Sequence, residues 1–241
     1  MNETLTKIFR YIRILGVRRT FVKICGRKRI ARAPFFMLFR KKPRIGVIGC
    51  GQFSFSTIGY FIYSRTRERF KICFDIDNHA SESFARFYRV PKVAEKAEDV
   101  FNDPDVDVVY IASNHHTHTT YALEAMSNHK NIHIEKPIAV NWEQFYRLNR
   151  MVETYGKTVV AGYNRPFAQA IQIIDRRIAG RNLPLTLNCF IAGHRINPDH
   201  WYRNPGEGGR ICGNVGHWLD LAVHLLMQRD NYPHKFSIGL S

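Results

Sequence analysis

The sequence predicts an α/β protein in which a doubly wound parallel sheet is followed by an incomplete α/β substrate domain. Two observations predict this fold class. Between residues 44 and 163, short apolar runs typical of buried strands alternate with segments of helical periodicity. After residue 163 this alternation stops, although the chain continues to residue 241. Repeated alternation predicts a parallel sheet, because each helix carries the chain back across the sheet to the start of the next strand.

The order of the elements in the sheet region follows from their length and period. Short apolar runs predict strands, and apolar residues spaced by three and four predict helices. Asn141 followed by Gln144 has the spacing of a capping box, which marks the start of a helix. We therefore expect strands at residues 45–48, 71–74, 106–113, 131–135 and 158–162, a weak strand near Val93, and helices at 52–64, 78–88, 97–102, 118–127 and 141–155.

The region from residue 164 to residue 241 contains fewer elements. Apolar residues from Phe167 to Ile178 share one helical face, which ends at Gly180. We also expect a strand at 185–192 and a last helix at 217–227. One strand and two helices cannot form a covered sheet by themselves, so we interpret 164–241 as part of a domain for substrate binding or oligomerisation.

Residues 1–42 form a basic amphipathic arm. They hold 13 of the 36 lysines and arginines and one acid, Glu3, which gives the arm a net charge of +12. Apolar residues at helical spacing predict an amphipathic helix interrupted at Gly16, and a second apolar patch follows at Phe35–Phe39. The arm either packs on the body of the protein or lies on an anionic membrane surface. We expect no nucleic-acid contact, because no stacking pattern or recognition motif accompanies the charge.

The composition excludes several other classes of protein. With 45% apolar and 23% charged residues, the chain is neither disordered nor fibrous. The five cysteines form no CxxC pair, which argues against a zinc ribbon or a disulfide framework and favours a reducing cytosol. Residues 45–64 lack formal charge, but nine of these twenty residues are Gly, Ser, Thr or Gln, which is too polar for a membrane span. No secretory signal is evident, so we expect a cytoplasmic protein, with peripheral membrane contact through the arm as the alternative.

A glycine turn follows the first predicted strand, with the sequence Gly49-Cys50-Gly51-Gln52-Phe53-Ser54. Gly49 permits a tight turn, and Gly51 lets the backbone approach a pyrophosphate held at the helix N-terminus. Ser54 occupies the third position, where this pattern normally has Gly or Ala. A glycine turn between a strand and a helix predicts a dinucleotide-binding Rossmann domain, which we place at residues 43–163.

An acid after the second strand supports the same interpretation, because it can bind the ribose hydroxyls of the dinucleotide. Asp75 fits this position, and Asp77 is the near alternative. No arginine adjoins Asp75 in the sequence to receive a 2′-phosphate, which favours NAD over NADP.

Two further polar segments follow predicted strands. The segment from Ser113 to His118 contains three histidines, but no carboxylate or cysteine nearby completes a familiar metal-ligand set. A loop that lines the nucleotide crevice is the better interpretation. Glu135-Lys136-Pro137 follows the next strand and directs Lys136 to the same crevice, where burial would suit it to proton transfer. A salt bridge between Lys136 and Glu135 is the alternative.

Together these motifs resemble the glucose–fructose oxidoreductase/inositol dehydrogenase (Gfo/Idh/MocA) family. The resemblance extends from about residue 44 to residue 227 and includes GYNRPF at Gly162–Phe167 and GGRICGNVGHWLDL at Gly208–Leu221. It implies an NAD(P)-dependent oxidoreductase that transfers a hydride between a sugar or sugar-nucleotide carbon and nicotinamide. The last two motifs are most similar to members found with surface-polysaccharide biosynthesis.

The resemblance also implies roles for individual residues. Lys136 becomes the central residue for substrate binding and proton transfer, and Pro137 the cis proline after it. His217 becomes the active-site histidine on the last helix, while Asn164 and Arg165 orient the substrate. The residues expected to bind the cofactor are Gly49, Gly51, Gln52, Phe53, Asp75, Ser113, His116 and Glu135.

The sequence departs from the family pattern in two respects. Four residues before His217 the family often has an aspartate, and this chain has Gly213. Family members also continue well past the length of this chain. A non-catalytic dinucleotide-binding protein and a membrane-surface partner protein therefore stay as alternatives, and a homo-oligomer is possible because the second domain is incomplete.

Overall fold

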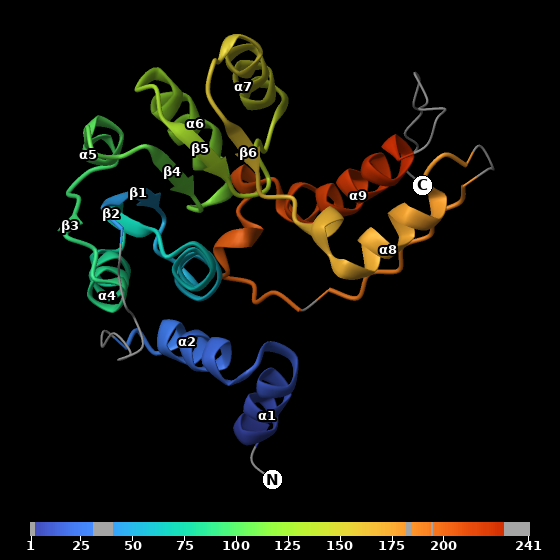
Figure 1. The fold of residues 1–241 in the computed structure, drawn as a ribbon, viewed down its shortest axis with the longest axis horizontal. Helices are drawn as coiled ribbons and strands as arrows, with labels where there is room; N and C mark the ends of the chain where they lie inside the picture. The colour runs from blue at the N-terminus through green and yellow to red at the C-terminus, as the bar shows by residue number, and fades with distance from the viewer. Residues whose placement is uncertain (1–2, 31–40, 182–184, 194, 229–241) are drawn as a thin grey trace. The chain divides into compact units, whose positions relative to one another are not determined.

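A computed structural model describes residues 3–30, 41–181, 185–193 and 195–228. Residue contacts divide the chain into two compact units, residues 1–161 and residues 162–241. Figure 1 shows the elements of each unit along the chain.

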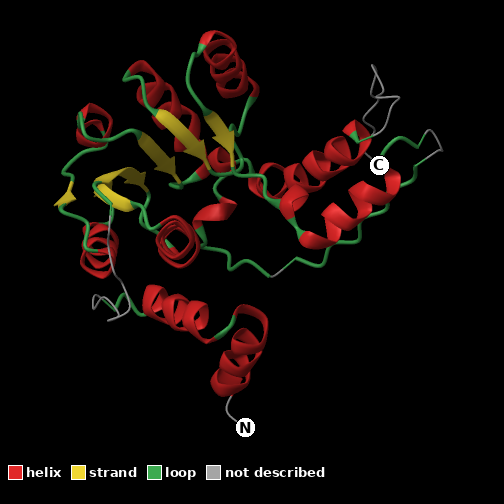
Figure 2. Ribbon diagram, viewed as in Figure 1, coloured by secondary structure: helices red, strands yellow, loops and turns green. Residues whose placement is uncertain are grey.

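The first unit contains a six-stranded parallel sheet with the strand order β3-β2-β1-β4-β5-β6. This is the strand order of a doubly wound Rossmann sheet, so the predicted fold class is confirmed. The strands, yellow in Figure 2, are β1 (Pro43–Ile48), β2 (Arg69–Phe74), β3 (Lys92–Val93), β4 (Val108–Ile111), β5 (Asn131–Ile134) and β6 (Val159–Ala161).

Helices cover both faces of this sheet, as Figure 1 shows for α4 on one side and α6 and α7 on the other. The segment after the glycine turn is helical from Gln52 and contains two π-helical turns. The helices are η1 (Ser54–Ile58), α3 (Gly59–Phe61), η2 (Ile62–Thr66), α4 (Asn78–Tyr88), α5 (Glu98–Asn102), η3 (His115–Thr117), α6 (His118–Ser127) and α7 (Trp142–Thr154).

Two hydrophobic cores lie on the two faces of the sheet. Val47 belongs to the core that contains Phe55 and Phe84, whereas its neighbour Ile48 belongs to the core that contains Val100 and Leu148. Successive residues of a strand point to opposite faces, so a strand that is buried on both faces is apolar throughout. This explains why a continuous apolar run predicted β1.

The first core fixes the helix that follows the glycine turn. The Tyr88 ring lies against Gly59, where a Cβ atom would come within 2.5 Å of the ring. The Tyr88 hydroxyl donates a hydrogen bond to the carbonyl oxygen of Phe55 in η1. A buried carbonyl without a donor is costly, so this bond supports the irregular turn.

Most predicted boundaries agree with the structure. Asn141 is confirmed as the N-cap of α7, because its side chain accepts a hydrogen bond from the Gln144 N–H, while the Gln144 side chain accepts one from the Val140 N–H. The strand expected at 106–113 is shorter. The Val106 N–H bonds to the Asp103 carbonyl in a turn, so the ladder begins at Val108.

The predicted helix in the arm is confirmed as two helices, α1 (Glu3–Leu15) and α2 (Val17–Arg27), separated by Gly16 at φ +78°. Helix α2 contributes two fully buried side chains, Val22 and Cys25, to the first core. The apolar patch at Phe35–Phe39 lies outside the described residues.

The second unit is helical. It contains η4 (Arg165–Phe167), α8 (Gln169–Ile178), η5 (Trp201–Arg203), η6 (Pro205–Glu207), η7 (Ile211–Val215) and α9 (Gly216–Met227). His224 of α9 and Asp175 of α8 form an ion pair at 3.0 Å when the imidazole is protonated. The strand expected at Leu185–Ala192 is wrong, since these residues belong to no strand. A β-propensity run becomes a strand only when a partner strand pairs with it, and the described residues of this unit include no strand.

Within the ranges that the structure describes, no helix has both the length and the hydropathy that crossing a bilayer requires.

Candidate functional site

The carboxyl ends of four neighbouring strands meet at one edge of the sheet. Their last residues are register partners: Phe74 pairs with Ile48, Ile48 with Ile111, and Ile111 with Ile134. The residues that follow these ends therefore gather at the edge where open α/β sheets bind their ligands. They are Gly49, Asp75, Ser113, Glu135 and Lys136.

The two glycines of the turn meet different constraints. Gly49 has φ +89°, and a Cβ atom there would lie 2.5 Å from the Ala112 carbonyl oxygen and 2.6 Å from the Ser113 nitrogen. The protein itself therefore requires glycine at 49. At Gly51 a Cβ atom would meet nothing within 4 Å, so the protein leaves open space beside the turn. Open space beside a backbone is what a closely approaching pyrophosphate needs.

The two acids after β2 have different roles. Asp75 accepts a hydrogen bond from the Cys50 N–H at 2.6 Å, which connects the end of β2 to the glycine turn. Asp77 is the N-cap of α4, and its side chain accepts a hydrogen bond from the His79 N–H at 2.9 Å. Of the two acids, Asp75 is therefore the one in contact with the predicted cofactor site.

The first turn of the helix offers backbone N–H groups that have no partner inside the helix. The Gln52 side chain donates a hydrogen bond to the Lys23 carbonyl at 3.2 Å, so we expect Gln52 to contact the cofactor through its backbone. Phe53 is exposed, and Ser54 is fully buried. A small side chain at 54 permits the close packing of helix and strand that glycine or alanine usually gives at this position.

His118 connects the loops after β4 and β5. One ring nitrogen lies 2.8 Å from the Pro137 carbonyl oxygen and the other 3.0 Å from the Ser113 carbonyl oxygen. His116 is exposed, and its carbonyl accepts a hydrogen bond from the Gln144 side chain. Across the described part of the chain, no group of three or more His, Cys, Asp or Glu side chains could hold a metal ion.

Glu135 and Lys136 follow β5, and both residues are half-buried. The Lys136–Pro137 peptide bond is cis, as the resemblance implies. Burial raises the pKa of the Glu135 carboxyl to about 7, although the backbone N–H and the charge of Lys136 act in the opposite direction. Near neutral pH this site therefore holds a carboxyl that exchanges a proton easily, beside an amine.

The residues expected around the substrate belong to the second unit. The rings of Tyr163 and His217 make an edge-to-face contact at 5.7 Å. The Arg165 guanidinium lies 4.2 Å from the centre of the Trp218 ring, and Asn164 is exposed. The structure therefore brings Tyr163 and Arg165 to the first turn of α9, next to His217.

Gly213 is buried in η7, so this chain places no side chain at the position where the family often has an aspartate. Asp220, three residues after His217 on α9, is a carboxylate that the sequence analysis did not single out. Burial raises the pKa of Asp220, while His224 opposes this. The spacing of three residues on one helix was the sequence signal that could have found it.

Arg29 was also missed. It lies 21 residues before Cys50 in the sequence, and its guanidinium donates a hydrogen bond to the Cys50 carbonyl at 2.8 Å. No local pattern marks such a contact, because the intervening chain carries no periodic signal that links the two positions.

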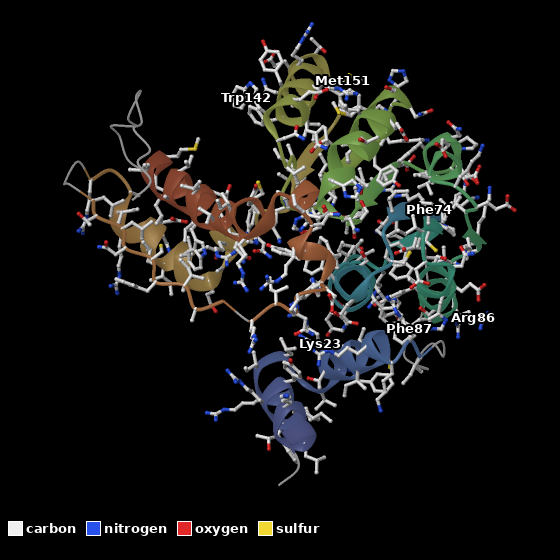
Figure 3. The ribbon with its side chains drawn as sticks, turned by 180° about the vertical axis from the view of Figure 1, so that it is seen from behind. Lys23, Phe74, Arg86, Phe87, Trp142 and Met151 are labelled. Carbon is white, nitrogen blue, oxygen red and sulfur yellow. The ribbon has the colours of Figure 1, made fainter. Side chains whose placement is uncertain are left out.

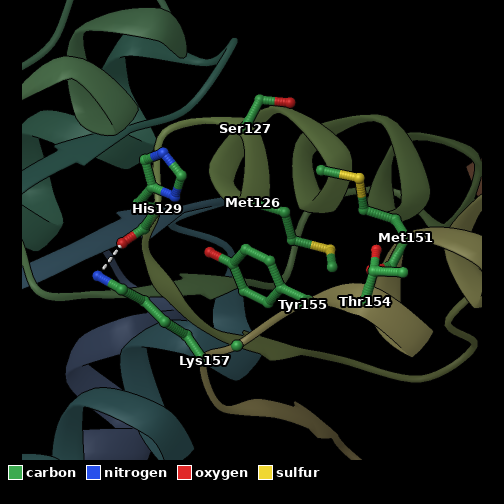
Figure 4. A pocket seen from close by; sticks show the side chains of 8 residues that line it. Met126, Ser127, His129, Met151, Thr154, Tyr155 and Lys157 are labelled. Atoms are coloured by element: carbon green, nitrogen blue, oxygen red, sulfur yellow. Dashed lines mark hydrogen bonds between the residues drawn. The ribbon is translucent and has the colours of Figure 1, made fainter.

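A pocket of about 600 Å³ lies elsewhere on the first unit (Figure 4). Its residues precede β5 and β6, so it opens near the amino ends of the strands, away from the glycine turn. The Lys157 ammonium there donates to the His129 carbonyl. The pocket is lined by Met126, Ser127, His129, Met151, Thr154, Tyr155, Gly156 and Lys157.

Comparison with known proteins decides the family. Residues 43–163 match the family GFO_IDH_MocA, described as an oxidoreductase family with an NAD-binding Rossmann fold. The chain belongs to the Gfo/Idh/MocA oxidoreductase family. Its first unit thus contains an NAD-binding Rossmann domain, with NAD as the cofactor.

Two relatives show how much of a family member the chain represents. It is 30% identical over 190 residues to 1-carboxy-3-chloro-3,4-dihydroxycyclohexa-1,5-diene dehydrogenase of Comamonas testosteroni. The aligned region covers 77% of this chain and 47% of that protein. It is 29% identical over 189 residues to an inositol 2-dehydrogenase of Ralstonia nicotianae. Here the aligned region covers 76% of this chain and 52% of that protein. The chain spans about half the length of the curated relatives it matches.

Solved structures agree on the fold. Myo-inositol dehydrogenase of Lactobacillus casei, solved with NAD(H) and myo-inositol, is 26% identical with a TM-score of 0.53, covering 57% of this chain and 41% of that one. An NAD-binding protein of Listeria innocua is 22% identical with a TM-score of 0.61, covering 79% of this chain and 56% of that one, and shows the fold alone.

Alanine at the two glycines of the turn is expected to separate folding from cofactor binding. Gly49→Ala should lower the free energy of unfolding by about 2 kcal/mol or more, because it combines a positive φ with a clash against Ala112. Gly51→Ala should leave that free energy within about 0.5 kcal/mol of the parent while weakening NAD binding at least about tenfold, because the methyl group fills the open space. Thermal unfolding and calorimetric NAD titration measure the two effects. Equal NAD affinity in Gly51→Ala and the parent would contradict this assignment of the open space.

Glu135 is expected to make the stability of the fold depend on pH. Its pKa of about 7 lies above the ordinary value of 4.5, so the folded state holds the proton more tightly than the unfolded state. The stabilising contribution is fully present below pH 4.5 and is lost as the pH rises through 7. Relative to Glu135→Gln, which stays neutral, the parent should lose up to about 3 kcal/mol over this window. Urea unfolding of both proteins at several pH values measures it, and parallel pH profiles would refute the raised pKa.

Proposed function

We propose that the protein is an NAD-dependent oxidoreductase that acts on a hydroxyl group of a sugar, polyol or sugar nucleotide. The observation that carries this proposal is the register of the strand ends, which places Lys136 at the same edge as the glycine turn. The relatives support the substrate class, because two of them are named for diol or inositol dehydrogenation.

The proposed chemistry assigns proton transfer to Lys136. NAD, when bound, accepts the hydride from the carbon that carries the hydroxyl group. Lys136 removes the hydroxyl proton as that carbon is oxidised. Glu135 is the neighbouring carboxyl whose pKa of about 7 lets it exchange a proton with Lys136 near neutral pH. Gly49, Gly51, Gln52, Phe53 and Asp75 would hold the dinucleotide, with Ser113, His116 and Glu135 toward its nicotinamide end.

The second unit is proposed to contribute His217 as a further acid or base, with Asn164 and Arg165 orienting the substrate. Tyr163 packs against the His217 ring and limits its rotation. Because position 213 is glycine, we propose that Asp220 supplies a carboxylate to this helix instead.

We also propose a substrate class and a cellular location for the reaction. The motifs at 162–167 and 208–221 support a sugar nucleotide of polysaccharide biosynthesis as the substrate, in the cytoplasm. NADP is disfavoured because Asp75, a carboxylate, lies where a 2′-phosphate would approach.

Removing the Lys136 amine is expected to abolish turnover and spare cofactor binding. Lys136→Ala should reduce kcat on a panel of sugars, polyols and sugar nucleotides by at least about 100-fold, since general acid–base groups contribute factors of this size. NAD affinity should change by less than about threefold. Reduced-cofactor absorbance measures turnover, and calorimetry measures binding. Lys92→Ala, which removes an exposed lysine from β3, is the control. Unchanged turnover in Lys136→Ala would remove this residue from the reaction.

A non-catalytic role for the same fold gives a different result. Exposed apolar residues in the second unit, such as Phe167 and Ile211, support a surface that a partner or a second copy covers. This alternative predicts NAD binding without turnover on any substrate of the panel, and a homo-oligomer in sedimentation experiments.

A second candidate function rests on α1. The side chains of Leu5 and Phe9 are 50% and 63% exposed, and Arg10 and Arg13 lie exposed beside them. An exposed apolar face flanked by arginines is typical of helices that lie on anionic bilayers. We propose a peripheral contact of this kind for α1, while α2 belongs to the core.

Charged residues on the apolar face of α1 are expected to prevent membrane binding. The parent should sediment with phosphatidylcholine vesicles only when they contain phosphatidylserine, and Leu5→Glu with Phe9→Glu should stay in solution. Phe190→Glu, at a side chain that is 98% exposed in the second unit, is the matched control. If the parent does not sediment with anionic vesicles, or if the double variant sediments like the control, α1 does not contact the membrane.

A further inference from the structure

Helix α2 of the arm contacts the start of the nucleotide-binding helix at successive positions. The Arg29 guanidinium bonds to the Cys50 carbonyl at 2.8 Å, and the Gln52 side chain bonds to the Lys23 carbonyl at 3.2 Å. Lys23 lies on α2 in Figure 3. Gly26 lies close enough that a Cβ atom there would come 2.9 Å from the Phe55 ring. Lys23, Gly26 and Arg29 all lie outside residues 43–163, the range that the family match covers.

The contact at Cys50 fixes the orientation of a peptide group. The Cys50 carbonyl and the Gly51 N–H belong to one planar trans peptide unit, so they point in opposite directions. When Arg29 holds the carbonyl, it also sets the direction of the Gly51 N–H. Asp75 does the same for the preceding peptide, because it holds the Cys50 N–H at 2.6 Å. Two side chains of opposite charge, one that follows α2 and one that follows β2, thus hold the two peptide units of the turn.

Such support matters because the turn has glycine on both sides of Cys50. Glycine has the fewest restrictions on φ and ψ, so the Cys50–Gly51 peptide group, which ends at a glycine, rotates more easily than one between two residues that carry side chains. A turn that samples other orientations in the free protein binds a ligand less tightly, because binding must select the competent one. Fixing both peptide groups before the dinucleotide arrives removes this cost.

The end of α2 brings Arg29 to the turn. Arg29 follows the C-cap of α2 with φ +51°, and the next N–H, of Ile30, bonds back to the Cys25 carbonyl. This arrangement strongly favours glycine, because a side chain is disfavoured in the left-handed region. Arg29 adopts this conformation, as Arg67 and Arg89 do at the ends of their own helices, and its guanidinium reaches the glycine turn.

We propose that Arg29, which follows α2, is a positioning residue for the NAD site. Its guanidinium holds the Cys50–Gly51 peptide in the orientation that presents the backbone N–H groups of the turn to the pyrophosphate. The inference rests on the proposed binding of NAD at this turn, and it adds to the family's Rossmann domain an element from residues 17–30.

The test compares two arginines of the same segment. Arg29→Ala should raise the Kd and the KM for NAD about tenfold while kcat at saturating NAD stays within about twofold, because the cofactor is held in the same place once bound. Arg27→Ala removes the same charge from a residue whose side chain contacts Tyr11 instead of the turn, so NAD affinity should not change. Arg29→Lys and Arg29→Gln, which can still donate to a carbonyl, should recover part of the affinity.

The outcomes separate this inference from the proposed function. If the parent binds no NAD, the proposed function is wrong and the inference with it. If the parent binds NAD and Arg29→Ala binds it equally well, only the positioning role is wrong. If Arg27→Ala and Arg29→Gln weaken binding as much as Arg29→Ala, the arm acts through its charge and not through the Cys50 carbonyl. Glycine amide resonances in ¹⁵N spectra give a direct view, since exchange broadening at Gly51 should appear in Arg29→Ala and not in Arg27→Ala.

Discussion

The close approach of Gly49 to the end of β4 is the constraint on which the site depends. The turn passes so near the Ala112 carbonyl that no side chain fits, and its φ of +89° suits glycine alone. Because β1 lies between β2 and β4, a shift of this turn would move the loops that follow both neighbours. The packing of two backbone segments therefore sets the geometry that the polar residues at this edge use.

The two helices of the arm differ in how far their side chains are buried. Its second helix is joined to the core through Val22 and Cys25, and its first helix leaves apolar side chains exposed. Not all of its charge is available to a partner, because Lys41 and Lys42 form ion pairs with Glu68 and Asp105. The net charge of the first 42 residues thus includes charges that are already paired within the protein.

Much of the first unit could be predicted from the sequence, because its signals are local. Buried parallel strands read as apolar runs, the glycine turn has a fixed place between strand and helix, and Asn141 begins its helix through a bond to a residue three positions away. The same reasoning failed at 185–192, where strand formation depends on a partner that the local sequence does not specify. It also missed Arg29, whose contact with Cys50 joins distant segments. The positions of the residues that follow strand ends were therefore predictable, whereas the contact of Arg29 with the turn was not.

His118 has a consequence for the spacing of the two loops that follow β4 and β5. Its two ring nitrogens lie at a fixed separation and face carbonyl oxygens of different loops, at Ser113 and at Pro137. The rigid aromatic ring thus acts as a spacer, and the distance between the loops is determined by covalent geometry more than by the flexibility of either one. A longer or more flexible side chain at this buried position would let the two loops move apart, so the tolerance of the protein to substitution at 118 should be narrow.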